Sequence, residues 1–563
     1  MRAFRWASNQ LADQGVIGFI TNGGWIRNLS FNGFRKALHT EFNDVYVLDL
    51  RGNKDFYRLT RDQLHAEGGN VFNQGSKTPI AITLLVRNPN STHHVIHYHD
   101  IGEHLTTRQK LNILSDTLNN PIHGFQWETI HPDEYHDWLD QRNPDYNQLL
   151  PLALNKLKQP MGVFSIWSSG YTTGRDAYAY DYSKNMLQEN MRRLHTTYQE
   201  SLEQEHRVID RTRIDWTRPL IHAWQQHQPI DYQPNMIRET LYQPFSRKWL
   251  YYAPHLLDRT SSMNQLYPPE LKNLEANIII DAGAEGNPDY SVLASNIPVD
   301  GCVTNKGVCL PLYWYEKLQE PALHYPDDKT IMASDGTVFI RHHAITSQTL
   351  TLFQNTYPNE PLLHGDNAKT AIFHYVYGVL NTPAYYETYR NNLTKQKPRI
   401  PLAADFKTYE HLGVQLLNLH AYYENVQPWA GIQETWSGPR DYTIVDRLKH
   451  PRNGRQEDYS RIIINDSLTL ENIPPQAYEW KVRGRSPIEW VMNQYQMKTD
   501  KQSGNLRDPN QWGIEHGNPR YVVDLVEKLA TVSIRTMQLL EHLPSLDPLP
   551  HTIGWPIEWD TVE

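Results

Sequence analysis

Cysteine is almost absent from this sequence of 563 residues, since Cys302 and Cys309 are the only two. Two thiols cannot form the disulfide framework of a small secreted domain, and no further Cys/His pair stands at the spacing of a structural zinc site. We therefore expect two ordinary reduced thiols. A chain of this length can bury several cores, so about two to four domains are expected.

Long apolar runs are missing as well. No stretch approaches the roughly 18 to 20 apolar residues that cross a bilayer, and residues 1–14 have the pattern of a polar helix rather than of a secretory signal. The sequence therefore predicts a cytoplasmic protein without a membrane segment.

Positive charge is in deficit, because the formal net charge is −9. The chain as a whole does not attract nucleic acid, so a DNA site would have to come from local clusters of Lys and Arg. Aromatic residues are plentiful at 11%, with 33 Tyr and 16 Trp. They suit both stacking interfaces and large aromatic cores, and composition does not decide between these uses.

Two kinds of chemistry have no signature in the sequence. The phosphate-binding loop Gly-x-x-x-x-Gly-Lys-Ser/Thr of a nucleotide-driven motor is absent. His93, His94, His97 and His99 lie in an alternating stretch, where a solvated strand face is favoured over metal ligation. No metal site is predicted.

The first ninety residues alternate between helical and strand patterns. An apolar run at 16–20 stops at Thr21-Asn22-Gly23-Gly24, a helical pattern follows at 31–39, and apolar strands are predicted at 45–50 and 80–86. Apolar strands separated by helices indicate an α/β sheet covered on both faces. So few strands would make an incomplete sheet, the second half of a domain.

The remaining chain has a different pattern. Short apolar strands such as 278–280 alternate with Pro- and Gly-rich turns between 162 and 423, which favours a mixed α+β fold, and helical spacing is expected at 138–154 and 519–543. The predicted divisions are a first domain at 1–95, a connection at 96–135, an α+β region at 136–475 and a helical C-terminal part at 476–563.

Several strings, weak alone, occur together in a specific order. They include Gly15-Val-Ile-Gly-Phe-Ile-Thr-Asn22, Gly170-Tyr-Thr-Thr-Gly-Arg175, Tyr242-Gln-Pro-Phe-Ser-Arg-Lys248 and Gly484-Arg-Ser-Pro-Ile-Glu-Trp490. Further strings stand at 31–36, 47–52, 375–378, 398–401, 498–504 and 532–536. In this order the chain resembles the C-terminal part of Type ISP restriction-modification enzymes and of single-chain N6-adenine DNA methyltransferases.

The resemblance implies a division of labour. In that family a nuclease and a helicase motor precede an N6-adenine methyltransferase domain, and a target-recognition region ends the polypeptide. This chain matches the last strands of the methyltransferase sheet and the α+β target-recognition region with its helical C-terminus. The implied partner is double-stranded DNA, and the implied cofactor of the complete enzyme is S-adenosylmethionine.

The cofactor loop and the catalytic Asn-Pro-Pro-Tyr motif of the family belong upstream of residue 1, and neither is found here. Asn143-Pro-Asp-Tyr146 and Asn287-Pro-Asp-Tyr290 lack the second proline. Asp281-Ala-Gly-Ala-Glu-Gly286 is favoured as a turn over a cofactor loop. We expect no catalytic residue in this chain, no cofactor bound by the chain alone, and no methyl transfer without the missing half.

The resemblance also places a target-base pocket. Adenine must leave the duplex for its amine to react, and a base outside the stack needs an aromatic face. The loop at 69–72 makes Phe72 the candidate for stacking, with ordinary loop packing as the alternative. Asn22 ends the first strand, where ligands of α/β sheets collect, so it is a second candidate for the pocket, although a turn-stabilising role is favoured.

Base reading requires Arg, Lys or amide side chains at the surface. Arg175, Arg247, Lys248 and Arg259 are candidates together with Tyr251. The alternative is that 242–252 forms a core strand in which Arg247 answers a buried carboxylate. A third basic cluster, diluted by acids, is favoured as solvated surface; it contains Arg440, Arg447, Lys449, Arg452, Arg455 and Arg461.

Three functional hypotheses stay open. The chain could supply target recognition within an adenine-specific methyltransferase. It could instead be a non-catalytic specificity polypeptide that acts with a catalytic partner encoded upstream. The apparent start inside a domain would also suit the remnant of a disrupted gene.

Overall fold

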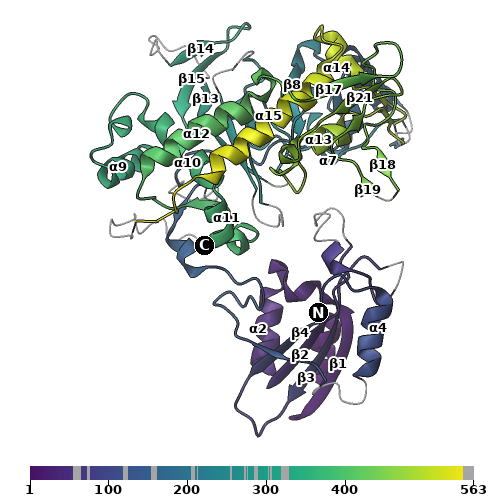
Figure 1. The fold of residues 1–563 in the computed structure, drawn as a ribbon, viewed down its shortest axis with the longest axis vertical. Coiled ribbons are helices and arrows are strands. Elements are labelled where there is room, and N and C mark those ends of the chain that lie inside the picture. The colour runs from purple at the N-terminus through teal and green to yellow at the C-terminus, as the bar shows by residue number, and fades with distance from the viewer. Residues whose placement is uncertain are drawn as a thin grey trace. The chain divides into compact units, whose positions relative to one another are not determined.

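The computed structural model describes residues 1–54, 65–72, 76–117, 124–153, 162–204, 209–211, 213–253, 256–271, 274, 277–283, 290–301, 303–304, 307–318, 329–454, 456–501 and 503–549. The chain divides into two compact units (Figure 1). The first is mainly Met1–Asn147 with Tyr389–Lys395, and the second is mainly Gln148–Glu285, Tyr290–Thr388 and Gln396–Glu563. Each unit is described by itself.

The first unit is built on one sheet with the strand order β1-β3-β2-β4-β5. Its strands are β1 (Gly15–Asn22), β2 (Asp44–Asp49), β3 (Ile80–Arg87), β4 (Val95–Asp100) and β5 (Glu128–Ile130). β3 runs antiparallel to both β1 and β2, whereas β2 and β4 are parallel. The carboxyl ends of β1 and β2 therefore share one edge with the start of β3.

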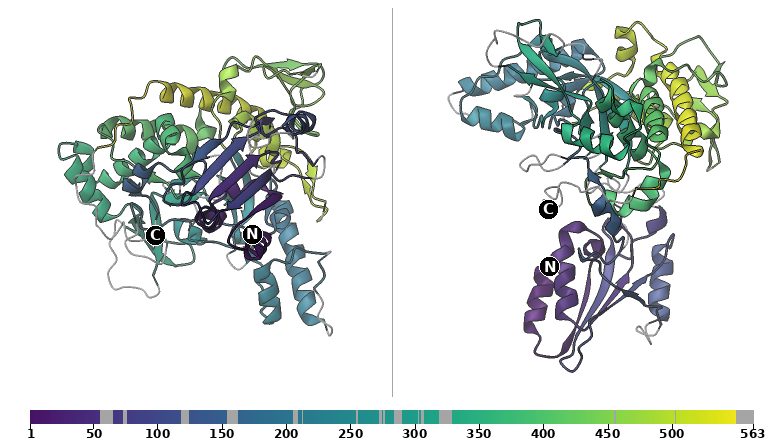
Figure 2. Two further views of the ribbon diagram at one scale, coloured as in Figure 1. Left: turned by 90° about the horizontal axis from the view of Figure 1, so that it is seen from below. Right: turned by 90° about the vertical axis from the view of Figure 1, so that its left-hand side faces the viewer.

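Helices cover both faces of this sheet. Phe4 of α1 (Arg2–Gln10) and Leu38 of α2 (Asn32–Glu41) pack with Val45 and Val47 on one face. On the other face, Ile113 of α4 (Thr107–Asp116) packs against a separate cluster that includes Leu48 and Ile80. Figure 2, right, shows these helices on opposite sides of the strands. The expected α/β sheet covered on both faces is confirmed.

The predicted connection at 96–135 is wrong in structural terms. β4 and β5 extend the sheet and α4 packs on its face, so this segment belongs to the first unit. Its strands carry polar side chains: His97 Nε2 lies 3.0 Å from Asp44 Oδ1, and its ring stacks on Tyr46. β4 alternates polar and apolar residues, so it lacks the continuous apolar run from which the strands at 45–50 and 80–86 were predicted.

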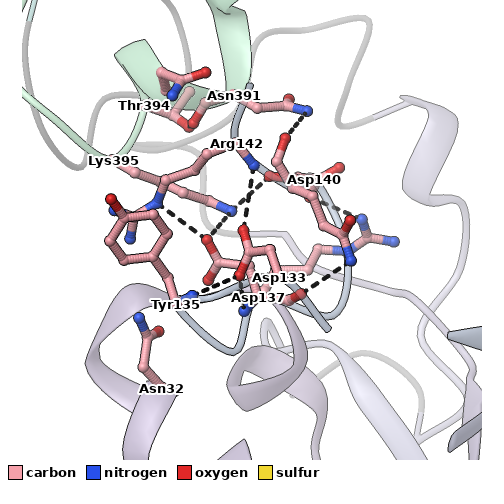
Figure 3. A network of polar contacts seen from close by, with 12 residues as sticks. Asn32, Asp133, Tyr135, Asp137, Asp140, Arg142, Asn391, Thr394 and Lys395 are labelled. Atoms are coloured by element: carbon pink, nitrogen blue, oxygen red, sulfur yellow. Dashed lines mark hydrogen bonds and ion pairs between the residues drawn. The ribbon is translucent and has the colours of Figure 1, made fainter. Parts of the chain in front are cut away.

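The predicted helix at 138–154 is also wrong over the described residues, which form η3 (Pro144–Gln148) and β6 (Leu150–Pro151). Instead of a helix, residues 131–143 are organised by the buried carboxylate of Asp137 (Figure 3). Asp137 accepts bonds from Arg35 Nη2 at 2.8 Å, Lys395 Nζ at 2.9 Å and Arg142 Nε at 3.2 Å. These charge-assisted bonds tie the segment to α2 and to the residues after α11.

The second unit contains several small antiparallel sheets. β9 (Ser246–Tyr251) lies between β7 (Tyr180–Asp181) and β8 (Ile237–Gln243), and β10 (Ile279–Ala282) lies between β11 (Val292–Ser295) and β12 (Val308–Pro311). β15 (Val338–His343) lies between β13 (Tyr313–Lys317) and β14 (Thr330–Met332), and β21 (Leu468–Glu471) between β17 (Gln433–Trp436) and β20 (Ile462–Ile463). The remaining pairs are β16 (Arg399–Ile400) with β6, β18 (Arg452–Asn453) with β19 (Gln456–Glu457), and β22 (Lys498–Thr499) with β23 (Leu506–Arg507).

Helices pack between and around these sheets. They are α5 (Asp176–Ala179), α6 (Lys184–Glu203), α7 (Arg218–Gln225), α8 (Met263–Leu266), α9 (Ser347–Thr356), α10 (Ala368–Leu380), α11 (Pro383–Leu393), α12 (Phe406–Ala421), α13 (Pro487–Gln494), α14 (Asn510–Glu515) and α15 (Tyr521–Glu541). Short 3-10 turns of the second unit are η4 (Pro234–Met236), η6 (Pro361–Leu363), η7 (Tyr423–Asn425) and η8 (Pro475–Tyr478). The first unit contains the 3-10 turns η1 (Gly23–Ile26) and η2 (Leu29–Phe31).

One large core joins the strands to the C-terminal helices. Leu250 of β9, Ile279 of β10, Trp490 of α13 and Val526 of α15 belong to the same buried cluster. The helix predicted at 519–543 is confirmed as α15, which crosses the second unit beside α12 (Figure 1). The predicted α+β character is confirmed, and the C-terminal helices share the core of the preceding strands.

Close packing of α10 on α12 depends on two glycines. A Cβ on Gly378 would lie 2.0 Å from the Tyr409 carbonyl oxygen, and one on Gly413 would lie 1.8 Å from that of His374. Both contacts are with backbone, which cannot move aside as a side chain can. The two helix axes can therefore approach closely only because both positions lack a side chain.

Cys309 is buried and unpaired in β12, and Cys302 lies outside the described residues. Burial raises the pKa of the Cys309 thiol well above its ordinary value. Such a thiol is protonated and unreactive at neutral pH.

Candidate nucleic-acid interface

The sheet edge of the first unit carries both residues of the predicted base pocket. Asn22 ends β1, and Phe72 lies in the loop that leads from β2 to β3. Because β1 and β2 are parallel, the ends of these strands meet at one edge. Ligands of α/β sheets gather outside such carboxyl ends.

Phe72 presents its ring to solvent, with 61% of the residue exposed. Its N–H donates to Asn70 Oδ1 at 2.9 Å, while Asn70 Nδ2 donates to the carbonyls of Gly52 at 3.2 Å and Thr78 at 2.9 Å. Asn70 itself is 1% exposed. Among the described residues, this exposed ring on a backbone fixed by a buried amide is accessible for stacking.

The start of the Phe72 loop is fixed against α4. The N–H of Gly69 donates to the Leu105 carbonyl at 2.8 Å, and Thr107 Oγ1 donates to the Asn70 carbonyl at 2.8 Å. A Cβ on Gly69 would stand 2.5 Å from the backbone nitrogen of Thr107. Glycine at position 69 thus permits the close approach that orders the loop.

Asn22 stabilises a turn and is also exposed at the end of β1. Its Oδ1 accepts a hydrogen bond from the Gly24 N–H at 2.8 Å, which stabilises the turn after β1. The residue is nevertheless exposed at the sheet edge. Its amide oxygen is used by the turn, whereas its amide nitrogen makes no hydrogen bond with the described residues.

Most of the predicted DNA-contacting residues lie in the second unit's interior. Arg175, Lys248 and Tyr251 are only 2%, 3% and 1% exposed. Arg247 and Lys248 come from the β8–β9 hairpin, whose strands pack against the large core. Burial contradicts the expectation that Arg175 and Tyr251 offer their polar ends to DNA, whereas Lys248 borders a cavity.

Arg175 shows why a DNA-contacting residue was predicted at a buried position. Its Nη2 bonds to Thr217 Oγ1, while Nε and Nη1 find no partner among the described residues. Burial lowers the pKa of Arg175 to about 10, although Asp215 and Asp258 lie near enough to oppose the shift. The turn that carries Arg175 is polar in sequence but covered by distant parts of the chain.

Arg247 follows the core-strand alternative. Its Nε lies 3.2 Å from Glu424 Oε1 and its Nη1 3.5 Å from Glu239 Oε2. The guanidinium also lies 5.5 Å from the centre of the Tyr423 ring. This side chain pairs with partly buried carboxylates within the second unit, as that alternative predicts, through its Nε and Nη1 atoms.

Tyr251 and Arg259 have opposite environments. The Tyr251 hydroxyl accepts from the Gln233 N–H at 2.8 Å, and its ring stacks on Tyr232 at 5.6 Å. Arg259 exchanges backbone hydrogen bonds with Thr172 at 2.8 and 3.0 Å, and its side chain is exposed. Of the five predicted DNA-binding residues, Arg259 is the most exposed.

A small cavity of about 210 Å³ lies beside Lys248. We call it the Lys248 cavity; its lining residues are Tyr182, Tyr242, Gln243, Lys248, Asn493, Gln494, Gln496, Lys498 and Arg507. Burial lowers the pKa of Lys248 to about 7. Arg507 was not predicted to lie beside Lys248, because only the fold brings β23 to the β8–β9 hairpin.

The third basic cluster is mostly exposed. Arg440, Arg447 and Lys449 lie on the surface, and Arg455 lies outside the described residues. Arg452 and Arg461 pair with Glu457 and Glu471, each at 2.8 Å. Such exposed pairs are typical of solvated surface.

The resemblances to catalytic motifs have structural roles. Tyr146 is fully buried, and Asn143 exchanges hydrogen bonds with Asn392 at 2.9 and 3.1 Å. Asp281 is buried in β10, where Thr304 Oγ1 donates to it at 2.8 Å and burial raises its pKa to about 6. Residues 284–289, which complete the other two motifs, lie outside the described residues.

Among the described residues, no group of three or more His, Cys, Asp or Glu side chains is placed to hold a metal ion. None of the described helices has the length and apolar character to cross a membrane.

The family model of the Type ISP C-terminal specificity domain matches residues 162–525, well over half of the chain. The chain belongs to this family. The matched range of this Type ISP chain contains Arg259 and every residue that lines the Lys248 cavity.

Solved structures extend the similarity to both units. A nuclease-deletion mutant of the Type ISP restriction-modification enzyme LlaGI, in complex with a DNA substrate mimic, is 34% identical with a TM-score of 0.79. The ATP-dependent Type ISP enzyme LlaBIII bound to DNA is 32% identical with a TM-score of 0.83, and the DrdV–DNA complex is 27% identical with a TM-score of 0.80.

Each similarity covers 97% of this Type ISP chain. The chain spans 48% of the LlaGI chain, 34% of the LlaBIII chain and 52% of the DrdV chain. No curated protein sequence matches it.

Proposed function

We propose that this chain recognises the double-stranded DNA target of a Type ISP restriction-modification enzyme, which in its complete form methylates adenine at N6 with S-adenosylmethionine. The observation that carries the proposal is the match of residues 162–525 to the Type ISP specificity domain. The similarity to three enzymes solved with DNA, over 97% of the chain, supports it.

The first unit would contribute to the target-base pocket. The amine of adenine is paired inside the duplex, so the enzyme must move the base out of the stack. Phe72 offers an exposed ring on a fixed loop, and the free amide nitrogen of Asn22 lies at the same sheet edge. A ring and a polar group at one edge suit a base outside the stack.

The second unit would read the sequence with side chains that reach solvent. Arg259 is exposed, whereas Arg175 and Arg247 are largely buried. Arg259 is therefore the candidate among these three arginines for a base or phosphate contact. Arg175, Arg247 and Tyr251 would instead stabilise the scaffold that presents such groups.

Two carboxylates that could bind the ribose of S-adenosylmethionine are engaged within their own unit. Asp281, which follows the pattern of a cofactor-loop strand, is buried and bonded to Thr304. Asp49, at the end of β2, is also buried and accepts from the Tyr98 hydroxyl at 3.0 Å. Neither carboxylate is free to bind a ribose, so the cofactor and the catalytic motif would come from upstream residues, in the same polypeptide or in a partner.

The test is a selection from a pool of random DNA duplexes by the purified chain. Sequencing of the bound fraction over successive rounds should reveal one enriched motif, and each substituted base pair should weaken binding by about 1 to 3 kcal/mol. Recovery of duplexes without any shared sequence, with affinity set by salt alone, would contradict target recognition.

A further inference from the structure

The Lys248 cavity brings together three cations from distant parts of the second unit. Lys248 comes from β9, and Lys498 and Arg507 come from the β22–β23 hairpin. Tyr182 and Tyr242 form its aromatic wall: Lys248 Nζ lies 3.9 Å from the Tyr242 ring centre and 4.8 Å from that of Tyr182. None of the described residues that line the cavity carries a carboxylate.

Lys248 lacks a hydrogen-bonded counter-ion. It is 3% exposed, and its ammonium makes no hydrogen bond or ion pair with the described residues. Burial of an ammonium without an acceptor is costly, so such groups are paired or bind a ligand. The cavity next to it provides the space for an acceptor.

Arg507 also lacks a hydrogen-bonded counter-ion among the described residues. Its Nε is buried without a hydrogen-bond partner among the described residues, and the whole guanidinium makes no ion pair with them. A guanidinium presents several donors in a fixed plane, the geometry that oxyanions accept. Lys498, which is exposed, adds a third charge at the same cavity.

The nearest acids are already engaged. Asp176 accepts from the Tyr242 hydroxyl at 3.0 Å and from Thr173, and Asp181 Oδ1 accepts from the Ser183 N–H at 2.9 Å. Burial raises the pKa of Asp181 to about 6, despite the opposing charges of Lys248 and Arg507. These acids reduce the positive potential but leave the three cations without a direct partner.

We propose that the Lys248 cavity binds one phosphate group of the DNA backbone, held by Lys248, Arg507 and Lys498. The proposal rests on the proposed function and deepens it by naming a contact. A chain with a net charge of −9 needs local cation clusters to hold DNA. A phosphate contact would fix the orientation of the duplex without reading its sequence.

The DNA arm of the test compares duplex binding by the full chain and its variants over a series of salt concentrations. Lys248→Met keeps the apolar stem in its aromatic surroundings, Arg507→Gln keeps an amide, and Lys498→Met changes an exposed position. Each should reduce the slope of log affinity against log salt by about one unit and weaken all duplexes about equally. Lys407→Met, at an exposed position of α12, is the matched control and should leave the slope unchanged.

The second arm titrates inorganic phosphate into the chain without DNA, at constant ionic strength, and follows binding by calorimetry. Saturable binding by the wild type and the Lys407→Met variant, lost in Lys248→Met and Arg507→Gln, is expected. Folded variants with the wild-type salt slope would overturn the proposal. Phosphate binding combined with an unchanged DNA slope would also overturn it, since the cavity would then serve a free anion.

The two proposals fail in different ways. If the selection finds no preferred sequence but the salt slopes change as expected, target recognition fails and the phosphate contact stands. If a sequence is selected but the slopes do not change, target recognition stands and the phosphate contact fails.

Discussion

Replacement of Arg247 by Met should destabilise the second unit rather than change the DNA sequence that the chain prefers. Only 12% of the Arg247 side chain is exposed, and its guanidinium lies between Glu424 and Glu239 at 3.2 and 3.5 Å. Met retains the apolar stem that packs against the neighbours. The change therefore removes the charge while keeping most of the volume.

The expected loss in the free energy of unfolding follows from the two carboxylates that lose their cationic partner. Removal of one partner from a fully buried ion pair costs about 3 to 5 kcal/mol. Here Glu424 and Glu239 keep 25% and 35% of their side-chain surface exposed, so water can solvate part of the lost interaction. We expect a loss of about 2 kcal/mol in the free energy of unfolding.

Urea unfolding of the wild type and the variant measures this loss, and competition binding with altered duplexes measures preference. Arg452→Met is the matched control, because Arg452 also forms an ion pair but is 69% exposed, and it should cost less than about 1 kcal/mol. A stable Arg247→Met variant that discriminates less at one base pair would refute the reasoning and make Arg247 a base reader.

Two further predictions concern the first unit and the core of the second. In a complete enzyme, Phe72→Ala should reduce methylation by the equivalent of about 1 to 3 kcal/mol of base stacking, whereas Phe72→Tyr keeps the ring and should stay close to wild type; equal turnover of the Ala variant would contradict the stacking role. Burial lowers the pKa of His420 to about 3, below the ordinary value of 6.5, so the unfolded state takes up its proton first as the pH falls. The wild type should therefore lose stability from about pH 6.5 towards pH 3, and His420→Gln should lose less over this window; parallel unfolding curves for both proteins would show that His420 does not contribute.

The sequence predicted the parts of the fold that depend on local pattern. The apolar runs of β1, β2 and β3 and the helical spacing of α15 identify buried elements without knowledge of their partners. The alternating stretch around His97 indicated the strand β4, but its pairing with β2 was not predicted, because cross-strand contacts such as His97 with Asp44 leave no mark in the local pattern. The helix expected at 138–154 fails because Asp137 is held by Arg35 and Lys395, whose positions the local sequence does not contain.

The candidate site was predicted less well than the fold, and for a physical reason. Phe72 was proposed because the family resemblance places its loop beside the target base, and its role there stays a prediction. The burial of Arg175 and Lys248 was not predicted, because burial is decided by contacts with segments far along the chain, such as Thr217 and Arg507. A charged side chain in a polar string is therefore a poor indicator of exposure.

Exchange of the specificity region tests the central claim most directly. In the complete LlaBIII enzyme, the segment that corresponds to residues 162–525 would be replaced by these residues, and the sites modified in DNA would be mapped by sequencing. We predict that the modified sequence changes from that of LlaBIII to the sequence selected by the isolated chain. A folded hybrid that still modifies the LlaBIII sequence would contradict the claim that this chain determines the DNA target.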